Sequence, residues 1–412
     1  MSRPVPTLRG WVVGACGVLA LAGAGWFGRV DLLFAGLLLT LTPLAAMLAV
    51  AFDRPWLTVR RSYAPDSVPA GDGAQVRLEV RNESSRPAPA FSWFDAAPAE
   101  VGAIAPRAFP SLAPGDAATL RYTARAGRRG AYLLGPLRVQ RSDPFGLARC
   151  GYAVGESKVL LVTPRAVPLG RGGPEQARGE GHDPELVRHS IPSADEVIPR
   201  DYRPGDALRR VQWRASARTG KLMVRQEEQR SNPEAWVLLD TVHTHDAASD
   251  DFERAVELTA SICTHLLELG YLVGVHETGP RRLSGVYELP GGDHVLLAQL
   301  AALEQGREND GDYAGRLSLS LRAGGGGSPV FLVLVDAPAE SWRDVVPLRR
   351  FADPAVAFLM SATARTARAS LEAGGWVCVD ADAGVDAPAA WARAAEAQRG
   401  RARAGFVGGR HV

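Results

Sequence analysis

Residues 200–228 read RDYRPGDALRRVQWRASARTGKLMVRQEE, and this stretch decides how the rest of the chain is interpreted. Its Pro-Gly pair at residues 204–205 suits a type II turn, and Asp206 follows in the position of a helix N-cap. We predict a helix over residues 207–218, ended by Gly220 as its C-cap. Side chains of alternating character then predict a β-strand directly after that glycine.

Arginine is concentrated in this stretch, which allows two interpretations. The first is a docking surface for an acidic partner or a phosphate, with Trp213 as an aromatic anchor. The second, a more common use of charge, is that the charges pair with one another while Trp213 fills the core. The whole chain carries 47 Lys+Arg against 45 Asp+Glu, so no broad basic surface for nucleic acid is expected. The candidates for partner binding are Arg200, Tyr202, Arg203, Asp206, Arg209, Arg210, Trp213, Arg214, Arg218 and Arg225.

The stretch resembles the signature of the family called domain of unknown function 58. The run RRGAYLLGPLRVQRSDPFGL at residues 128–147 resembles a second recurring stretch of the same family. The resemblance implies a membrane-tethered bacterial protein with a von Willebrand factor A-like domain. It also implies a MoxR-type AAA+ ATPase as a protein partner in the assembly or maturation of other proteins. Turn chemistry alone accounts for the second run, in which we expect Phe145 to pack inward.

Two uncharged stretches near the N-terminus, residues 11–28 and 32–52, each approach the length of about 17 to 25 residues that spans a bilayer. Only three residues separate them, which predicts two transmembrane helices over residues 10–52 that form a hairpin and contact membrane lipid. A cleaved signal peptide is the alternative for the first stretch. The flanking arginines favour the cytoplasm for both ends and for the soluble domains, in a protein of the plasma membrane. These arginines are Arg3, Arg9, Arg54, Arg60 and Arg61.

Composition divides the remaining chain. Over residues 56–164, apolar residues such as Val76, Leu78 and Val80 alternate with charged ones between Pro- and Gly-containing turns, which predicts an all-β sandwich of immunoglobulin-like type. Residues 165–198 are rich in Gly, Pro and charge, as in a linker. We expect residues 401–412 to be a basic flexible tail.

Residues 199–400 combine the signature stretch with strands that alternate with helices. Such alternation predicts a parallel sheet covered by helices on both faces, an α/β doubly wound domain. The resemblance to a von Willebrand A fold depends on this order and on Asp240, which ends the first strand. The predicted strands cover residues 236–239, 272–275, 330–335, 355–359 and 376–379, and the predicted helices cover residues 251–269, 293–303 and 363–372.

Sheets of this kind bind ligands at the carboxyl ends of their strands. The resemblance implies a metal motif, Asp-x-Ser-x-Ser, after the first strand, where this chain reads DTVHT at residues 240–244. Val242 offers no side-chain oxygen, which weakens an octahedral Mg²⁺ site. The alternative is a degenerate Mg²⁺ site of Asp240, Thr244 and Asp336, and no other cofactor is expected.

Catalytic motifs are not recognisable in the sequence. It contains no phosphate-binding loop with Gly-Lys-Ser/Thr, no Gly-x-Ser-x-Gly elbow and no nucleophile with an oriented base. We therefore predict a non-enzymatic scaffold or adaptor, anchored in the membrane, that binds a protein partner. The alternative is a Mg²⁺-dependent ligand-binding domain of the von Willebrand A type.

Overall fold

The structure is a computed structural model. It describes residues 4–52, 55–174, 199–201, 213–225, 233–243, 250–280, 282–283, 285–307, 312–323, 326–336 and 339–408. The chain divides into two compact units. The first comprises Met1–Val167, Ala247–Ser261 and Gly291–Gly306, and the second comprises Pro168–Asp246, Ile262–Pro290 and Arg307–Val412.

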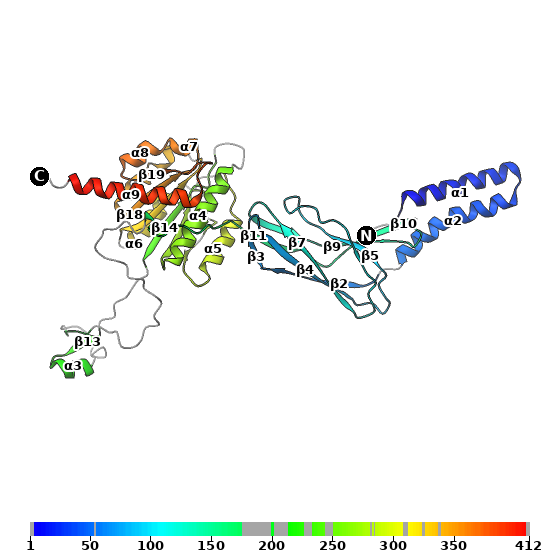
Figure 1. The fold of residues 1–412 in the computed structure, drawn as a ribbon, viewed down its shortest axis with the longest axis horizontal. Coiled ribbons are helices and arrows are strands. Elements are labelled where there is room, and N and C mark those ends of the chain that lie inside the picture. Colours follow the sequence, from blue (N-terminus) through cyan, green and yellow to red (C-terminus); the bar gives the residue numbers. More distant parts are fainter. Residues whose placement is uncertain are drawn as a thin grey trace. The chain divides into compact units, whose positions relative to one another are not determined.

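The first unit begins with a hairpin of two apolar helices, α1 (Leu8–Phe27) and α2 (Val30–Phe52), as predicted (Figure 1). Thr7 caps α1, because its hydroxyl accepts the backbone N–H of Gly10 at 3.2 Å. Both helices are long and apolar enough to cross a membrane, with 20 and 23 residues and mean hydropathies of 1.6 and 2.2. Large apolar side chains along both helices are exposed, including Leu8, Trp11, Leu19, Trp26, Phe34, Leu38 and Phe52.

The strands after the hairpin form a β-sandwich-like region of three sheets. Residues of β4 alternate between buried and exposed, as the sequence predicts, so Val76, Leu78 and Val80 enter the core beside Trp93 and Leu137. The five-stranded sheet has the order β1 (Val5–Pro6), β10 (Ala148–Val154), β9 (Leu137–Ser142), β5 (Phe91–Asp95) and β6 (Arg107–Phe109). The two three-stranded sheets are β2 (Leu57–Ala64), β4 (Gly73–Asn82) and β7 (Ala117–Arg125), and β3 (Ser67–Pro69), β11 (Lys158–Thr163) and β8 (Gly130–Leu134).

A buried ion pair lies inside this sandwich. Arg61 on β2 contacts Asp95 on β5, with 2.5 Å between Nη2 and Oδ1, and both side chains are almost fully buried. The Tyr122 hydroxyl donates to Oδ2 of the same carboxylate at 2.5 Å, and Arg61 also donates to the carbonyl of Glu156. At Gly135 a Cβ would lie 2.4 Å from the Arg61 guanidinium, so only glycine leaves room for that guanidinium. The pair thus joins strands of two sheets.

The first unit also contains the first part of α4 (Asp250–Glu268) and α5 (Gly292–Ala301), close to the predicted helix positions. Arg129, from the run at residues 128–147, contacts both helices and is 5% exposed. It forms an ion pair with Glu253 and donates to the carbonyls of Leu300 at 2.9 Å and Leu303 at 2.6 Å. Phe145 in the same run is 72% exposed, so the expectation that it packs inward is wrong.

The second unit contains a six-stranded sheet in which five strands run parallel. One short edge strand, β16, runs antiparallel to β15. All seven residues of β17 are buried, as expected for a central parallel strand. The order is β16 (Val286–Tyr287), β15 (Leu272–Glu277), β14 (Glu234–Leu239), β17 (Ser328–Leu334), β18 (Ala352–Leu359) and β19 (Val377–Asp380).

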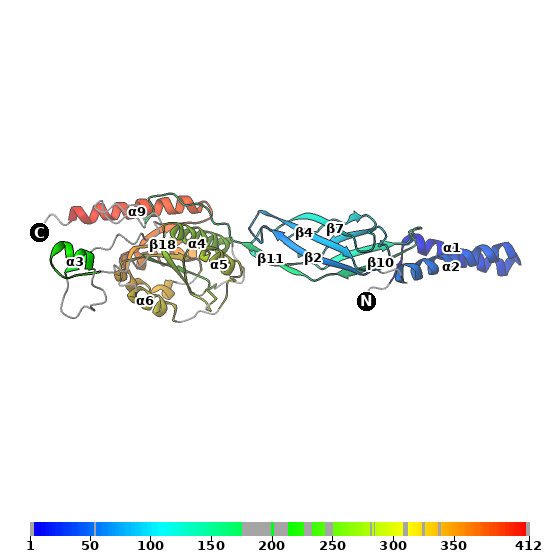
Figure 2. The same cartoon turned by 90° about the horizontal axis from the view of Figure 1, so that it is seen from below.

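Helices α6 (Tyr313–Ala323) and α9 (Ala387–Gly408) lie on opposite faces of this sheet (Figure 2). Leu317 of α6 packs in one cluster with Trp236 of β14. On the other face, Trp391 of α9 lies against Phe331 and Phe358, with ring centroids 5.2 and 6.4 Å apart. The sheet is therefore covered on both sides within this unit.

Several elements differ from the predictions. The sequence did not predict α6 or α9, and α9 includes residues 401–408, which we expected to belong to a flexible tail. The predicted helix over residues 363–372 is two short helices, α7 (Ala362–Arg365) and α8 (Arg368–Ala373). Most of the predicted linker, residues 175–198, lies outside the described residues.

We predict that Arg61→Ala destabilises the sandwich by about 3–5 kcal/mol, because it leaves the Asp95 carboxylate buried without its cation. Hydrogen exchange of the β2 and β5 amides in the full chain measures this loss locally. The exposed neighbour Arg60 is the control, and Arg60→Ala should change stability by less than about 0.5 kcal/mol. Equal protection of these amides in the two variants would contradict a supporting role for the ion pair.

Burial of the phenol raises the pKa of Tyr63 from 10.0 to about 12. The folded state therefore favours the neutral phenol, whose stabilising contribution is complete below pH 10 and is lost as the pH rises toward 12. We expect a fall in sandwich stability over this window, smaller in Tyr63→Phe than in the wild type. Unfolding followed at stepped alkaline pH tests this, and identical slopes for the two proteins would refute it.

Candidate functional site

Several polar side chains lie at the carboxyl edge of the parallel sheet, directly after its strands. The strands β14 and β17 are neighbours in the sheet. The chain continues from β14 to β15 on one side and from β17 to β18 on the other. Parallel α/β sheets commonly bind ligands at this position. Asp240 follows β14 and Asp336 follows β17, so the sequence located two residues of this edge correctly.

The carboxylate of Asp240 is fully buried and accepts hydrogen bonds from groups of four described residues. Its Oδ2 accepts the backbone N–H groups of Val335 at 3.0 Å and Asp336 at 2.9 Å. Its Oδ1 accepts the Thr278 hydroxyl at 3.0 Å and the backbone N–H of Val242 at 3.3 Å. A buried carboxylate requires such partners, because an unpaired charge in the interior is very costly. The side chain therefore ties together the ends of β14, β15 and β17.

Thr278 is a part of this arrangement that the sequence analysis missed. Its Oγ1 also accepts the backbone N–H of Thr241 at 3.0 Å, while the Thr241 hydroxyl accepts from the N–H of Gly279 at 2.9 Å. The two turns after β14 and β15 are thereby cross-linked. The only signal in the sequence was a threonine three residues beyond a predicted strand, which is too common to single out.

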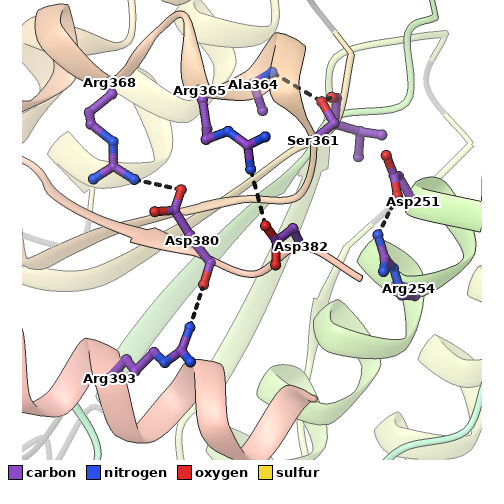
Figure 3. A network of polar contacts seen from close by, with 10 residues as sticks. Asp251, Arg254, Ser361, Ala364, Arg365, Arg368, Asp380, Asp382 and Arg393 are labelled. Carbon is purple, nitrogen blue, oxygen red and sulfur yellow. Dashed lines mark hydrogen bonds and ion pairs between the residues drawn. The ribbon is translucent and has the colours of Figure 1, made fainter. Parts of the chain in front are cut away.

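Further along the same edge, acidic side chains are paired with arginines (Figure 3). Asp380, at the end of β19, contacts Arg368 at 2.6 Å, and Asp382 contacts Arg365 at 3.2 Å. Ser361, just after β18, accepts the backbone N–H of Ala364 at 3.1 Å and so caps α7. These polar groups stabilise helix starts and strand ends.

These contacts decide whether the residues present fit a metal. Mg²⁺ needs oxygen ligands in near-octahedral geometry, and at Asp240 it would have to displace hydrogen-bond donors from both oxygens. Thr244, the second expected ligand, lies outside the described residues. Within the described part of the chain, no three His, Cys, Asp or Glu side chains are placed to hold a metal ion. The described donors at Asp240 therefore do not fit a resident Mg²⁺.

A small cavity of about 160 Å³ lies beside β15. Trp236 stacks on His276 there, with ring centroids 5.3 Å apart, and His276 Nε2 lies 3.2 Å from the Ser320 hydroxyl. Gly274 permits the stacking, because a Cβ would lie 2.0 Å from the Trp236 ring. Glu277 accepts the backbone N–H of Leu283 at 2.8 Å, and burial raises the pKa of this carboxyl.

The described residues of the signature stretch and its flank, 199–201 and 213–225, form two paired strands and one short helix. Strands β12 (Pro199–Asp201) and β13 (Met223–Arg225) pair antiparallel with each other, in a sheet separate from the six-stranded one. Helix α3 (Trp213–Thr219) ends at Gly220, whose φ of 70° is the left-handed conformation expected of a C-cap glycine. The Ser216 hydroxyl accepts the backbone N–H of Met223 at 2.9 Å and joins the helix to the second strand.

Trp213, at the start of α3, is 71% exposed. The interpretation in which it fills the core is therefore wrong for the described structure. Leu222 is 44% exposed, and Arg218 and Lys221 are also exposed. A large aromatic side chain thus stands on the surface with an aliphatic side chain and two cations nearby in sequence.

The same hairpin lies in a region with known relatives. Residues 199–305 match the model of a family described as "Protein of unknown function DUF58". The chain carries a DUF58 domain. The matched region covers the hairpin, the strands β14 to β16 and the helices α4 and α5, so it includes Trp213 and Asp240.

The chain is also similar to individual proteins. It is 26% identical over 185 residues to "Uncharacterized protein YeaD" of Bacillus subtilis (strain 168), a match that covers 45% of each protein. The chain thus spans about half the length of the curated relative that it matches. The CARDB domain of the PF1109 protein from Pyrococcus furiosus, solved in complex with di-metal ions, is 17% identical. That match covers 26% of this chain and 97% of the other, with a TM-score of 0.18.

A cycloisomaltooligosaccharide glucanotransferase from Paenibacillus sp. is 12% identical. The match covers 78% of this chain and 53% of the glucanotransferase chain, with a TM-score of 0.20. TM-scores this low support no argument about function. The DUF58 match is therefore the informative comparison.

Only part of the predicted partner-binding set of the DUF58 domain falls on described residues. Trp213 and Arg218 are exposed on α3. Arg214 belongs to α3, Arg200 to β12 and Arg225 to β13, so the fold brings the two strands and the helix of the set together. The others, Tyr202, Arg203, Asp206, Arg209 and Arg210, lie outside the described residues.

We predict that Asp240→Ala lowers the stability of the second unit by about 3–5 kcal/mol, because buried donors on three strand ends lose their acceptor. Asp240→Asn keeps one acceptor oxygen and should cost less. Urea unfolding combined with hydrogen exchange of β14 and β17 measures both. Asp382→Ala is the control on the same edge, where an ion pair that is nearly half exposed should contribute at most about 1 kcal/mol. Equal losses in Asp240→Ala and Asp382→Ala would contradict this role.

We also expect millimolar Mg²⁺ or Mn²⁺ to leave the melting temperature unchanged, since hydrogen-bond donors already occupy the Asp240 oxygens. Calorimetric titration and thermal unfolding of the wild type measure this. A saturable heat of binding that disappears in Asp240→Asn would establish the metal site instead.

Proposed function

We propose that the protein is a membrane-anchored, non-enzymatic scaffold whose DUF58 hairpin binds a protein partner. The exposure of Trp213 is the observation that supports this most directly. Exposed tryptophan and arginine side chains are enriched among the residues that dominate binding at protein interfaces. Trp213, Arg218, Lys221 and Leu222 form what we call the hairpin surface, an aromatic and basic group suited to an acidic partner.

The anchor in this proposal is the pair α1 and α2, spanning the plasma membrane as a hairpin. Their exposed apolar side chains favour contact with lipid over contact with water. The arginines that flank the two membrane helices α1 and α2 favour the cytoplasm for the soluble domains. The hairpin surface around Trp213 would then face cytoplasmic proteins.

We further propose that the six-stranded sheet is a von Willebrand A-like domain and that the sandwich is of immunoglobulin-like type. The strand order, with one antiparallel edge strand, supports the first assignment. The family resemblance then suggests a MoxR-type AAA+ ATPase as the partner, acting with this protein in assembly or maturation. Scaffolding is favoured over catalysis because the carboxylates of Asp240, Asp380 and Asp382 are all engaged in internal contacts.

We expect Trp213→Ala to weaken capture of a purified MoxR-type ATPase by the full chain about 30-fold or more, the loss typical of an interface hot spot. Trp56→Ala is a closely matched control. Trp56 is also 71% exposed, but it belongs to neither the β12–β13 hairpin nor the six-stranded sheet. Arg218→Glu should weaken capture as well, most strongly at low ionic strength. Unchanged capture by Trp213→Ala and Arg218→Glu would exclude the hairpin surface as the binding site.

A further inference from the structure

The end of the β-sandwich packs directly against the apolar hairpin. Leu147 forms a buried cluster with Ala46 and Val50 of α2. Thr7, which caps α1, donates its backbone N–H to the carbonyl of Leu147 at 2.8 Å and its hydroxyl to the carbonyl of Gly146 at 2.6 Å. Strand β1, just before this cap, pairs with β10 of the sandwich. Sandwich and helical hairpin are therefore in direct contact.

This packing sets how deep the end of the sandwich lies. Ala46 precedes the last residue of α2, Phe52, by six residues, or about 9 Å along the helix. The headgroup layer of one leaflet is only about 5–8 Å thick. When the hairpin spans a bilayer, the turn at residues 143–147 consequently lies where headgroups meet acyl chains.

The turn presents side chains suited to that depth. Asp143 holds the turn closed, because its carboxylate accepts the backbone N–H groups of Phe145 at 2.9 Å and Ala148 at 2.5 Å. Phe145 is 72% exposed at its tip. Arg9 is close by, since its Nη1 lies 3.9 Å from the place where Gly146 would carry a Cβ. An exposed Phe beside an arginine is typical of surfaces that lie in the membrane interface.

Beside this turn, the outer face of the five-stranded sheet is hollowed by a groove of about 310 Å³. Arg149 and Val5 line one end of it and are directly paired between β10 and β1. Arg138 and Phe94 line the other end and are directly paired between β9 and β5. In the register of β9 and β10, Gly151 and its partner Gln140 lie between Arg149 and Arg138, and both line the groove. The groove thus combines two guanidinium groups with apolar walls.

Both arginines of the groove are exposed, and neither forms an ion pair within the part of the chain that the structure describes. Guanidinium groups bind phosphate oxygens in bidentate geometry. The cytoplasmic leaflet carries anionic phospholipids, and Val5 lies only two residues before the cap of α1. The nearest abundant source of phosphate groups is therefore the leaflet that the hairpin enters.

We infer that this groove binds the phosphate headgroup of an anionic phospholipid, with Arg149 and Arg138 as its cationic ligands. The acyl chains of the bound lipid run along the hairpin, beside Phe145. The inference rests on the membrane anchoring in the proposed function. It adds to it a specific lipid contact that fixes the sandwich to the bilayer surface.

The test uses the full chain in a neutral detergent, titrated with short-chain phosphatidylglycerol or phosphatidylcholine. Thermal unfolding and native mass spectrometry report binding. We expect preferential binding of phosphatidylglycerol, about five-fold weaker in Arg149→Gln or Arg138→Gln and about 25-fold weaker in the double variant. Arg77→Gln, which removes an exposed arginine of β4 in a different sheet of the sandwich, should leave binding within about two-fold. Glycerol 3-phosphate and inorganic phosphate test the soluble sources and should bind at least about ten-fold more weakly than the lipid.

Undiminished phosphatidylglycerol binding in the double variant would overturn the site, as would equal binding of inorganic phosphate. Circular dichroism of each variant separates lost binding from lost folding. Alkaline extraction of native membranes tests the anchoring by itself. A wild-type chain that stays in the membrane pellet but shows no lipid preference refutes the groove alone, whereas a chain released by alkali refutes the anchoring.

Discussion

The Asp240 carboxylate holds the carboxyl edge of the parallel sheet together. It lies at the central strand and accepts donors from the turns that follow three adjacent strands. Because an ionised group in the interior is tolerated only with such partners, the turns are constrained to approach one another. The position where related architectures commonly hold a ligand is used here for internal order. The proposed partner-binding surface around Trp213 lies on the β12–β13 hairpin and does not involve this carboxylate.

The sandwich also contains a buried carboxylate that is satisfied by partners from several strands. Its buried carboxylate, Asp95, is neutralised by Arg61 and hydrogen-bonded by Tyr122, and it connects strands from different sheets. Burying such a pair contributes little net stability, since desolvation offsets much of the attraction. A strand arrangement that separated Arg61 from Asp95 would leave a buried charge without its partner, which is strongly destabilising. In both units, then, a buried carboxylate contacts groups from several strands or strand ends.

The sequence predicted the elements whose patterns are strong. Two long uncharged stretches predicted the hairpin, and the alternation around Val76, Leu78 and Val80 predicted a sandwich strand. Helix α6 was missed because Leu317, Leu319 and Leu321 alternate with polar residues, which is the pattern of a strand. In the structure Leu317 and Leu321 are buried one helical turn apart, while Leu319 is 69% exposed. Helix α9 was missed because its buried face consists mainly of alanines around Trp391, which give a weak signal.

The candidate site was predictable only where a residue directly ends a strand, as Asp240 does. Thr278 and Ser361 act through hydrogen bonds to groups distant in sequence, and no local pattern announces those contacts. The exposure of Trp213 and Phe145 could not be predicted either, since a large aromatic residue is more often inside.

The junction at Gly10 has a mechanical consequence. A Cβ there would lie 2.1 Å from the carbonyl oxygen of Leu147, so the helix backbone rests directly on the turn, and Thr7 fastens it by two hydrogen bonds. Because these contacts are direct, a change in the tilt of the α1–α2 hairpin would change the orientation of the sandwich with it. When α1 and α2 span a bilayer, as proposed, its thickness governs that tilt and therefore the orientation of the sandwich.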